Sequence, residues 1–425
     1  MKRSRDVPLG YLAEVRPSSV DKRLDDHERS VRLCNYTDVY YGDHITGEEV
    51  LMHGSVTPEE FARFRLRHDD VLITKDSESP DDIAVPAWVA RDPPDVVLGY
   101  HTTLIRPCAE LDGRYLYWTL QADPLRAYFS QHARGVTRFA LRQQDITAAP
   151  IPTPRLSVQR SIADYLDVET RRIDALRTSN EALRRLVRER HERFVIMAVA
   201  EGMDHEESVS SGEIGWLDVV AETFPIGPYA LYGRTGSGHT PSRSVPEYWL
   251  DCDIPWVTTA DVQQLRQGFE ESLADTAHKI SRLGMANSAA RLHPAGTVFL
   301  SRTASVGFAG VMAVPMATSQ DFFTWTPDER LVPEYLLWSL RAMRYAGHFD
   351  RLMYGSTHKT IYVPDLMVLR GPVPPIDDQR RIVSAIREQR DETRRLLDGL
   401  KRANRLLTER RTALITAAVT GELEV

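Results

Sequence analysis

Few residues of this chain have the types and spacing that catalysis or cofactor binding requires. Its histidines are scattered and form no His-Glu-x-x-His pair for zinc. Cys34, Cys108 and Cys252 lie too far apart for a zinc ligand set or a disulfide framework. Gly236-Ser-Gly238 is rich in glycine, but His239-Thr-Pro-Ser follows it where a phosphate-binding loop would open a helix. The sequence also lacks a Gly-x-x-x-x-Gly-Lys-Ser/Thr loop, a Gly-x-Ser-x-Gly elbow and an Asn-Pro-Pro-aromatic loop, so we expect no catalysis by this chain.

Two short polar segments, each built around a glycine, remain as places where the chain could bind a ligand. They are Ala133-Arg-Gly-Val-Thr-Arg138 and Tyr354-Gly-Ser-Thr-His-Lys359. Hydroxyl, lysine and arginine side chains around a glycine let the backbone and the side chains approach a groove together. Ordinary solvated loops are the alternative for both segments.

The elements that must position these segments come from an internal repeat. The second half of the chain matches the first at a constant offset of 220 residues, without a gap, over roughly a hundred positions. Further upstream, residues 31–39 resemble 254–262 and residues 71–75 resemble 298–302 at changed offsets. Only two copies of this length indicate a duplicated unit rather than a solenoid. The matched pairs include Tyr115 with Tyr335, Trp118 with Trp338, Gln159 with Gln379, and Glu189-Arg190 with Glu409-Arg410.

Each copy ends in a proline-containing boundary, at residues 150–154 and 372–375, followed by a long helical pattern. Apolar residues recur there in steps of four and three and form one stripe, which needs a partner helix. We expect the two helices to pair as an antiparallel coiled coil; the alternative is that each helix packs only on its own domain. The expected seam comprises Ile162, Leu166, Ile173, Leu176, Leu183, Val187, Phe194 and Met197 in the first helix and Ile382, Ile386, Leu396, Leu400, Ala403, Leu407, Leu414 and Ala417 in the second.

The segments before the two helices have the mixed pattern of α+β domains. Short strands are expected at 71–75 and 297–301, and helices at 115–131 and 333–349. Trp118 and Trp338 lie inside the apolar stripes of those helices, so both are expected in a core. The predicted organisation is one domain over residues 1–154, a helix over 155–204, a second domain over 205–374 and a second helix over 375–425.

Composition narrows the class of protein. No apolar run approaches the roughly 20 residues that cross a bilayer, and the basic start is not followed by an apolar stretch. With its separated cysteines, the chain fits a reducing cytoplasm. The net charge of -7 and a pI of about 6.0 count against a nucleic-acid ligand, unless positive charge is concentrated on one face.

Several of these features together resemble the specificity subunits of type I restriction–modification systems. Leu414-Ile-Thr-Ala-Ala-Val-Thr-Gly-Glu422 is similar to the end of that family's second helix. The Pro374-Pro-x-x-x-Gln379-Arg-x-Ile382 entry to the helix is similar too, and Pro154-x-x-x-x-Gln159-Arg-x-Ile162 repeats it. Gly238-His-Thr-Pro-Ser242 resembles an early element of the family's recognition domains, and Tyr354–Lys359 a late one. The first domain departs most, because it lacks a Gly-x-Thr-Pro-Ser element.

The resemblance implies a non-catalytic DNA-binding scaffold. Each target-recognition domain would read one half of a split, asymmetric site in double-stranded DNA, and the paired helices would set the unread spacer. About 45 helical residues would span on the order of 60 Å. Two methyltransferase subunits would bind the helices and supply S-adenosylmethionine chemistry, with no cofactor in this chain, and motor-nuclease subunits would complete the restricting enzyme.

On this hypothesis, DNA-contacting residues are expected in polar loops at equivalent positions of the repeat. Asn35, Tyr36, Thr258 and Thr259 are weaker candidates. A duplicated scaffold that joins two proteins without touching DNA is the alternative function, and the low pI favours it. A standalone nuclease or methyltransferase lacks the motifs it would need. The main candidates are Lys75, Arg134, Thr137 and Arg138 in the first domain and Arg302, Ser356, Thr357, His358 and Lys359 in the second.

Overall fold

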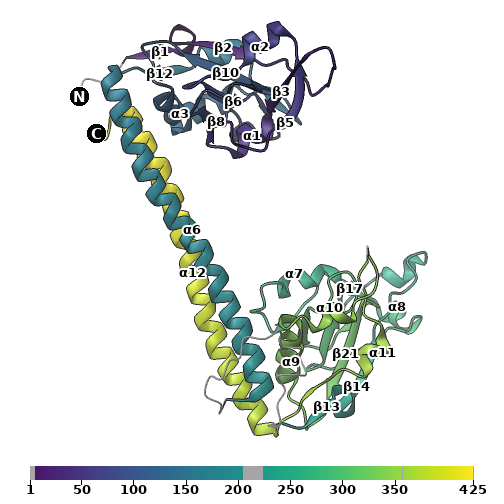
Figure 1. Cartoon of the computed structure of the whole chain (residues 1–425). Coiled ribbons are helices and arrows are strands. Elements are labelled where there is room, and N and C mark those ends of the chain that lie inside the picture. The colour runs from purple at the N-terminus through teal and green to yellow at the C-terminus, as the bar shows by residue number, and fades with distance from the viewer. Residues whose placement is uncertain (1–4, 204–223, 357, 425) are drawn as a thin grey trace. The chain divides into compact units, whose positions relative to one another are not determined.

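The structure is a computed structural model, and it describes residues 5–203, 224–356 and 358–424. It divides into two compact units (Figure 1). Unit 1 comprises residues 1–180 and 402–425, and unit 2 comprises residues 181–401. The division therefore crosses both long helices, and each unit contains part of each. The expected boundary between residues 204 and 205 lies outside the described residues.

Unit 1 combines strands and short helices with parts of the two long ones. Its helices are η1 (Leu9–Tyr11), α1 (Tyr36–Tyr41), α2 (Pro58–Phe64), η2 (Pro80–Asp82), α3 (Gly113–Gln121), α4 (Asp123–His132), α5 (Gln143–Thr147), and parts of α6 (Leu156–Glu201) and α12 (Ile376–Thr420). Its strands are β1 (Asp6–Pro8), β2 (Ala13–Pro17), β3 (Arg29–Cys34), β4 (His44–Ile45), β5 (Met52–Val56), β6 (Val71–Thr74), β7 (Asp76–Ser77), β8 (Pro86–Val89), β9 (Val96–Leu98), β10 (Thr102–Pro107), β11 (Phe139–Ala140) and β12 (Pro150–Pro152).

Unit 2 has the same composition of elements. Its helices are η3 (Tyr229–Tyr232), η4 (Pro246–Trp249), η5 (Thr259–Asp261), α7 (Val262–Leu265), α8 (Arg282–Ala286), α9 (Pro333–Tyr345), α10 (His348–Leu352), α11 (Val363–Met367) and the remaining parts of α6 and α12. Its strands are β13 (Ile226–Pro228), β14 (Gly233–Ser237), β15 (Ile254–Val257), β16 (Ser272–Leu273), β17 (His278–Ile280), β18 (Val298–Ser301), β19 (Ala309–Met312), β20 (Ala317–Thr318), β21 (Phe322–Pro327) and β22 (Arg370–Pro372).

The two units share one sheet topology. The five-stranded sheet has the order β2-β10-β6-β8-β4 in unit 1 and β14-β21-β18-β19-β16 in unit 2. In both sheets the last pair is parallel and the other pairs are antiparallel. A three-stranded sheet, β5-β3-β9 or β17-β15-β20, and a terminal pair, β1-β12 or β13-β22, also correspond. The predicted duplication of an α+β domain is therefore confirmed.

The central strands are buried on both faces. In β6, Val71 and Ile73 point into the core that α3 covers, whereas Leu72 packs in the core shared with the three-stranded sheet. In β18, Val298 and Leu300 similarly face one core and Phe299 the other. Successive strand residues point to opposite faces, so a continuous apolar run fits this position in both units.

The positions matched by the repeat include residues that hold each domain to its helix. The buried Gln159 amide accepts from Asp112 N at 2.9 Å and donates to Glu110 O and Pro154 O. Gln379 makes the same three bonds in unit 2, to the backbone of Val332, Arg330 and Pro374. Trp118 and Trp338 are both buried, as predicted.

The long helices run antiparallel within each unit. In unit 1 the start of α6 packs against the end of α12, where Ile162, Ala163 and Leu166 join Ile415 and Val419 in one core. Asn180 Nδ2 donates to Asn404 Oδ1 at 2.9 Å between the same two helices. In unit 2 the end of α6 meets the start of α12 in the same way, and the core there includes Val195, Ala198, Val199, Ile382, Val383 and Ile386. The predicted pairing is confirmed, and the helices also pack on the domains.

The predicted seam is wrong at several positions. Leu176, Leu183 and Leu396 are 55%, 46% and 45% exposed, whereas Leu397, one residue further along, is buried. A helix of 3.6 residues per turn drifts away from a strict 3.5-residue repeat, so the buried stripe leaves the heptad positions. At the helix ends the stripe turns toward a domain core, and Ile415 is buried there.

The helices expected at 115–131 and 333–349 are each interrupted. The first divides into α3 and α4 at Ala122, before Pro124 in the first turn of α4. The second divides at Gly347, whose φ of +70° is left-handed. The strands predicted around residues 71–75 and 297–301 are present as β6 and β18. Among the described residues, no helix has both the length and the apolar character needed to cross a membrane.

Candidate functional site

Two basic residues predicted from the repeat follow equivalent strands. Lys75 comes directly after β6; its N–H donates to His101 O at 3.0 Å, and its carbonyl accepts from Leu141 N. Arg302 follows β18, and its backbone bonds to Asp321 O and Ile361 N have the same pattern at 2.8 Å each. The backbone therefore places Lys75 and Arg302 at equivalent edges, each in its own domain.

The side chain of Arg302 also supports its own loop. Its Nε donates to Gln320 O at 2.9 Å and its Nη1 donates to Ile361 O at 3.4 Å. Part of its hydrogen-bonding capacity is thus used within the protein, which makes it a weaker candidate for ligand contact than a free arginine.

The two glycine-containing segments form loops beside these strand ends. Arg134 pairs with Ala140 across the first loop, and Tyr354 pairs with Thr360 across the second. The loops meet the neighbouring edge through β11-β7 in unit 1 and through Thr303 in unit 2. Thr357 lies outside the described residues. The other predicted residues of these loops are all exposed: Arg134, Thr137, Arg138, Ser356, His358 and Lys359.

A glycine is required at the centre of both loops. Gly135 has φ +148°, and a Cβ there would lie 1.9 Å from Arg138 O. Gly355 has φ +94°, and a Cβ there would lie 2.8 Å from His358 O. Both loops turn too tightly for a side chain at that position, which explains why the sequence has a glycine in each copy.

In unit 1 the exposed Arg138 is held by residues that the sequence did not identify. Its Nη2 donates to Asp76 Oδ1 at 2.6 Å, and Asp76 Oδ2 lies 2.6 Å from His101 Nδ1. The hydrogen bond to Asp76 and the negative charge of that carboxylate raise the pKa of Arg138, so the guanidinium stays cationic. Asp76 and His101 belong to segments far apart in the sequence, and no local spacing links them to Arg138.

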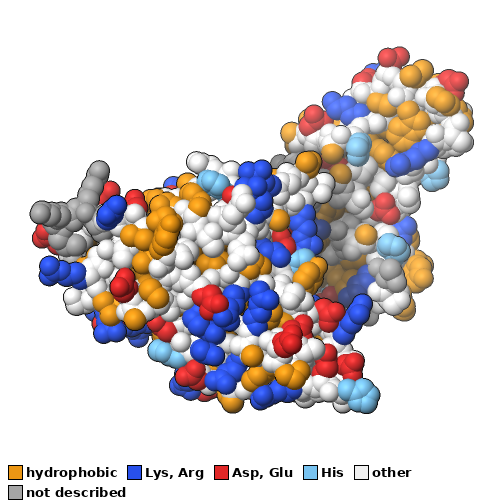
Figure 2. Space-filling view, turned by 90° about the horizontal axis from the view of Figure 1, so that it is seen from above, with side chains coloured by type: hydrophobic (Ala, Val, Ile, Leu, Met, Phe, Trp, Pro, Cys, Tyr) orange, Lys and Arg blue, Asp and Glu red, His pale blue; other side chains and the backbone are white. Residues whose placement is uncertain are grey.

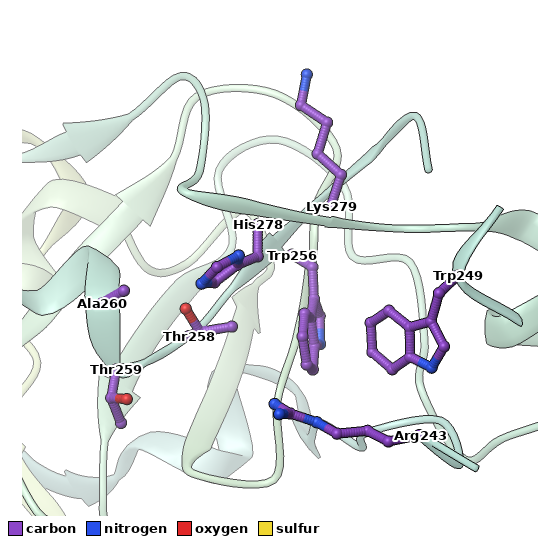
Figure 3. Close-up of a pocket in the computed structure, with 8 residues that line it drawn as sticks. All are labelled: Arg243, Trp249, Trp256, Thr258, Thr259, Ala260, His278 and Lys279. Carbon is purple, nitrogen blue, oxygen red and sulfur yellow. The ribbon is translucent and has the colours of Figure 1, made fainter. Parts of the chain in front are cut away.

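Each unit also has a cavity. The cavity in unit 1 has a volume of about 540 Å³, and His101 lies in its wall, so it adjoins the Arg138–Asp76 pair. Its lining residues are Asp21, Lys22, Arg23, Tyr36, Tyr100 and His101. The cavity in unit 2 has a volume of about 520 Å³ (Figure 3). Its lining residues are Arg243, Trp249, Trp256, Thr258, Thr259, Ala260, His278 and Lys279.

The two cavities occupy equivalent places. Arg23 comes six residues after the end of β2, and Arg243 comes six residues after the end of β14. Tyr36 and Thr259 both begin the short helix that follows the central strand of the three-stranded sheet. The shared offset of 220 residues between Arg23 and Arg243 was a signal in the sequence that pointed to this site.

The weaker candidates divide between structural and lining roles. Asn35 is buried, and its N–H donates to Asp38 Oδ2 at 2.7 Å, so it caps α1. Thr258 caps η5 through Asp261 in the same way, although it also lines the cavity of unit 2. Burial raises the pKa of Tyr36, so its hydroxyl stays a neutral donor at the cavity wall.

The charges on the visible surface are mixed. Figure 2 shows clusters of Lys and Arg side chains interspersed with Asp and Glu on the face turned toward the viewer. The electrostatic potential on that face is therefore not dominated by charges of one sign. Binding of an anion would therefore depend on particular residues such as Arg138 and Arg243.

Comparison with known proteins agrees with the fold. Residues 233–401 match the family described as "Type I restriction modification DNA specificity domain". The MjaIX specificity subunit of Methanocaldococcus jannaschii is 25% identical over 175 residues, 41% of this chain and 39% of the relative. The EcoR124I/EcoR124II specificity subunit of Escherichia coli is 21% identical over 295 residues, 68% of this chain and 66% of the relative. The matched regions thus span at most about two thirds of the length of these relatives.

Solved structures resemble the chain over almost its whole length. The HsdS subunit from Thermoanaerobacter tengcongensis has a TM-score of 0.56 at 17% identity, with 99% of this chain and 98% of that chain covered. A chain from a structure of the type I R-M system has a TM-score of 0.73 at 16% identity, with 100% and 99% covered. Residues 233–401 therefore carry the specificity domain of type I restriction–modification systems, and the whole chain has the duplicated fold of solved type I specificity subunits.

Proposed function

We propose that this chain selects the DNA sequence for a type I restriction–modification complex. Each unit acts as a target-recognition domain and reads one half of a bipartite, asymmetric site in double-stranded DNA. One observation supports this above all: two units of identical topology present different polar side chains on the same edge. Two related but unequal recognition surfaces match an asymmetric site with two halves.

The proposed contacts follow from the exposed side chains at each edge. Arg138 and Lys359 carry positive charge at the ends of the two glycine-containing loops, where they can reach phosphates or base edges. Lys75, Arg134 and Thr137 belong to the same edge of unit 1. Phosphate contacts supply affinity, whereas the few side chains that reach base edges supply the choice of sequence.

We further propose that the chain is a scaffold and performs no chemistry itself. Two methyltransferase subunits would bind the long helices and use S-adenosylmethionine, and motor-nuclease subunits would join that complex. The exposed apolar side chains on the helices, Leu176, Leu183, Leu186, Leu396 and Leu406, support a role in docking partner proteins. The dependence of the spacer on helix length stays a prediction.

Co-expression with a partner methyltransferase tests the proposal. We expect methylated adenines, mapped across the genome, to define one split motif with two different halves. Replacing residues 133–138 should change one half of the motif only, and replacing residues 354–359 should change the other half only. A continuous motif, or a change of both halves by one replacement, would contradict the two-domain mechanism.

Binding measurements distinguish this function from that of a scaffold that never touches DNA. DNA binding should weaken steeply as salt increases, because each phosphate contact releases counterions. Removing one such contact should lower the slope of log K against log salt by about 0.9. Binding without a salt slope, or no binding to any duplex, would favour the protein-only scaffold, which the negative net charge also suggests.

A further inference from the structure

The cavity of unit 2, which we call the tryptophan cavity, is lined by two indole rings together with cationic and hydroxyl side chains. Its volume of about 520 Å³ is that of a site for a small organic ligand. Base edges within a DNA groove are normally read by side chains that project into the groove. A concave pocket instead fits a group that projects from the DNA toward the protein.

Two indole rings form the apolar part of the tryptophan cavity. The ring centroids of Trp249 and Trp256 are 5.6 Å apart at an interplanar angle of 58°. Trp249 is fixed by a hydrogen bond from its Nε1 to Ser242 O at 3.1 Å. The rings therefore stand at an angle with a fixed geometry, and Trp249 remains partly exposed.

Trp256 contributes a polar atom without a partner. Its side chain is only 3% exposed, and its Nε1 makes no hydrogen bond within the described part of the chain. The nitrogen-bearing side of this ring faces Trp249 (Figure 3). A buried donor without an acceptor costs free energy. This nitrogen has almost no accessible surface, so a ligand in the cavity would contact other atoms of the Trp256 ring.

Cationic and hydroxyl groups complete the lining. The guanidinium of Arg243 reaches toward Trp256 (Figure 3), and it makes no ion pair with any described residue. His278, Thr258 and Thr259 add further donors and acceptors to the wall. Lys279 points away from the rings and lies 3.5 Å from Asp275, so Arg243 is the cation best placed for a ligand inside.

We propose that the tryptophan cavity binds a single nucleobase that has left the base stack of the DNA. A partly exposed tryptophan ring for stacking, hydrogen-bonding groups for the base edge and a guanidinium without an ion pair among the described residues are three features that recognise an unstacked nucleotide and its phosphate. This inference rests on the proposed DNA-binding function. It goes further by assigning a base-binding pocket to this chain itself.

The cavity of unit 1 provides an internal contrast. It occupies the equivalent place, but its lining has no tryptophan and includes the carboxylate of Asp21. The ring of Tyr100 lies against His101, and His101 is held by Asp76, so this wall is polar and internally bonded. We therefore assign the base-binding pocket to unit 2 alone.

A duplex with one unpaired adenine is the direct probe. An unpaired base needs less free energy to leave the stack than a paired one, so a pocket for it favours the bulged duplex. We expect the full-length chain, without any partner, to bind a fluorescein-labelled bulged duplex roughly tenfold more tightly than the fully paired duplex of the same sequence. The preference should be clear at moderate salt, where nonspecific binding is reduced.

Variants of the lining test which residues cause the preference. Trp249→Ala should reduce the tenfold preference by roughly fivefold or more, to nearly equal affinity for the two duplexes, because it removes a stacking ring, and Trp249→Phe should retain most of the preference. Leu250→Ala is the matched apolar control, because Leu250 is exposed and lies outside the lining. Arg243→Ala should also reduce the preference, whereas Arg282→Ala, which removes the same charge from an 83% exposed side chain, should not.

A fluorescent base at the bulge gives a second readout. We expect the fluorescence of an unpaired 2-aminopurine to be quenched on binding to the native chain and to Leu250→Ala, but not to Trp249→Ala. Equal affinity for the two duplexes, or a bulge preference that survives both Trp249→Ala and Arg243→Ala, would overturn the inference and leave the proposed function intact. Failure of the native chain to bind either duplex would instead reject the proposed function.

Discussion

Each unit has an ion pair between its domain and a long helix at equivalent positions, and the two charges are exchanged between the units. In unit 1, Arg114 of α3 pairs with Asp167 of α6 at 3.1 Å. At the equivalent positions of unit 2, Glu334 of α9 pairs with Arg387 of α12 at 3.3 Å. The attraction between domain and helix is kept although both charges are exchanged. Each pair therefore has to be complementary only within its own unit, and each unit can change independently of the other.

The same comparison distinguishes the residues that hold each domain to its helix from the residues of the proposed recognition surface. Gln159 and Gln379 keep three identical backbone bonds each, because a buried amide must satisfy its donors and acceptor. The cavity walls, in contrast, share little more than an arginine at an equivalent place. Residues that fix the fold are retained in both copies, whereas exposed residues next to the cavities differ.

The largest expected effects test the equivalence of the two cores. Trp118→Ala and Trp338→Ala should each destabilise the protein by about 3–5 kcal/mol, because each removes a buried indole and leaves a cavity. Urea denaturation, monitored by hydrogen exchange on peptides from each unit, would show that the loss of unfolding free energy is in the mutated unit. Leu231→Ala, at an exposed position, should change stability by less than about 0.5 kcal/mol. A loss from only one of the two tryptophans would break the equivalence.

The glycines at the centres of the two loops should differ in their tolerance. Gly135→Ala should cost about 1–3 kcal/mol, because its Cβ would lie 1.9 Å from a backbone oxygen. Gly355→Ala should lie at the lower end of that range, since its nearest contact is 2.8 Å. Val136→Ala, in the same loop and exposed, serves as the control in thermal melting. Equal costs for the two glycines would mean that the loops are not as different as their contacts indicate.

Removing one charge from each loop should sharpen the contrast in DNA recognition. Arg138→Ala and Lys359→Ala should each weaken binding by about 1–3 kcal/mol if the residue reaches a base, and lower the salt slope by about 0.9 if it reaches a phosphate. Fluorescence anisotropy across a salt series separates the two cases. Asp76→Asn should have a smaller effect than Arg138→Ala, since it leaves the guanidinium in place. No change in affinity or slope from either loop would remove both as contacts.

A smaller effect concerns acid sensitivity in unit 2. Burial lowers the pKa of His191, His293 and His348, all in that unit. Their folded-state pKa lies below the unfolded value of about 6.5, so the unfolded state binds more protons as the pH falls through that value, and stability decreases. The loss should be at most about 1.4 kcal/mol per pH unit for each histidine, and it should end below the folded-state pKa.

His191→Gln tests this prediction. The variant should flatten the decline in unfolding free energy between pH 7 and pH 5, because a neutral side chain then faces Gln389 in the buried site. Arg411 of unit 1 stands at the equivalent position, over the ring of Trp118, and its charge does not change in this range. An unchanged pH dependence in His191→Gln would mean that His293 and His348 carry the effect.

Local patterns were sufficient to predict the repeated domains. The apolar runs that became β6 and β18, the proline boundaries before α6 and α12, and the paired tryptophans all depend on neighbouring residues and their periodicity. The repeat also predicted that Lys75 and Arg302 are equivalent. The structure agrees, since the same backbone bonds recur at both residues. The helix breaks near Ala122 and Gly347 were missed, since the apolar stripe continues past each break.

The sequence by itself determined a duplicated α+β unit with a long helix after each copy, because burial of periodic apolar residues acts over a few turns or one strand. Only the tertiary structure decided that Ile162 and Ile415 share a core, that Arg138 meets Asp76 and His101, and that Arg243 and His278 line one cavity. These contacts join residues that are near in space and distant in sequence. Their geometry depends on how the sheets and helices pack, which no local pattern specifies.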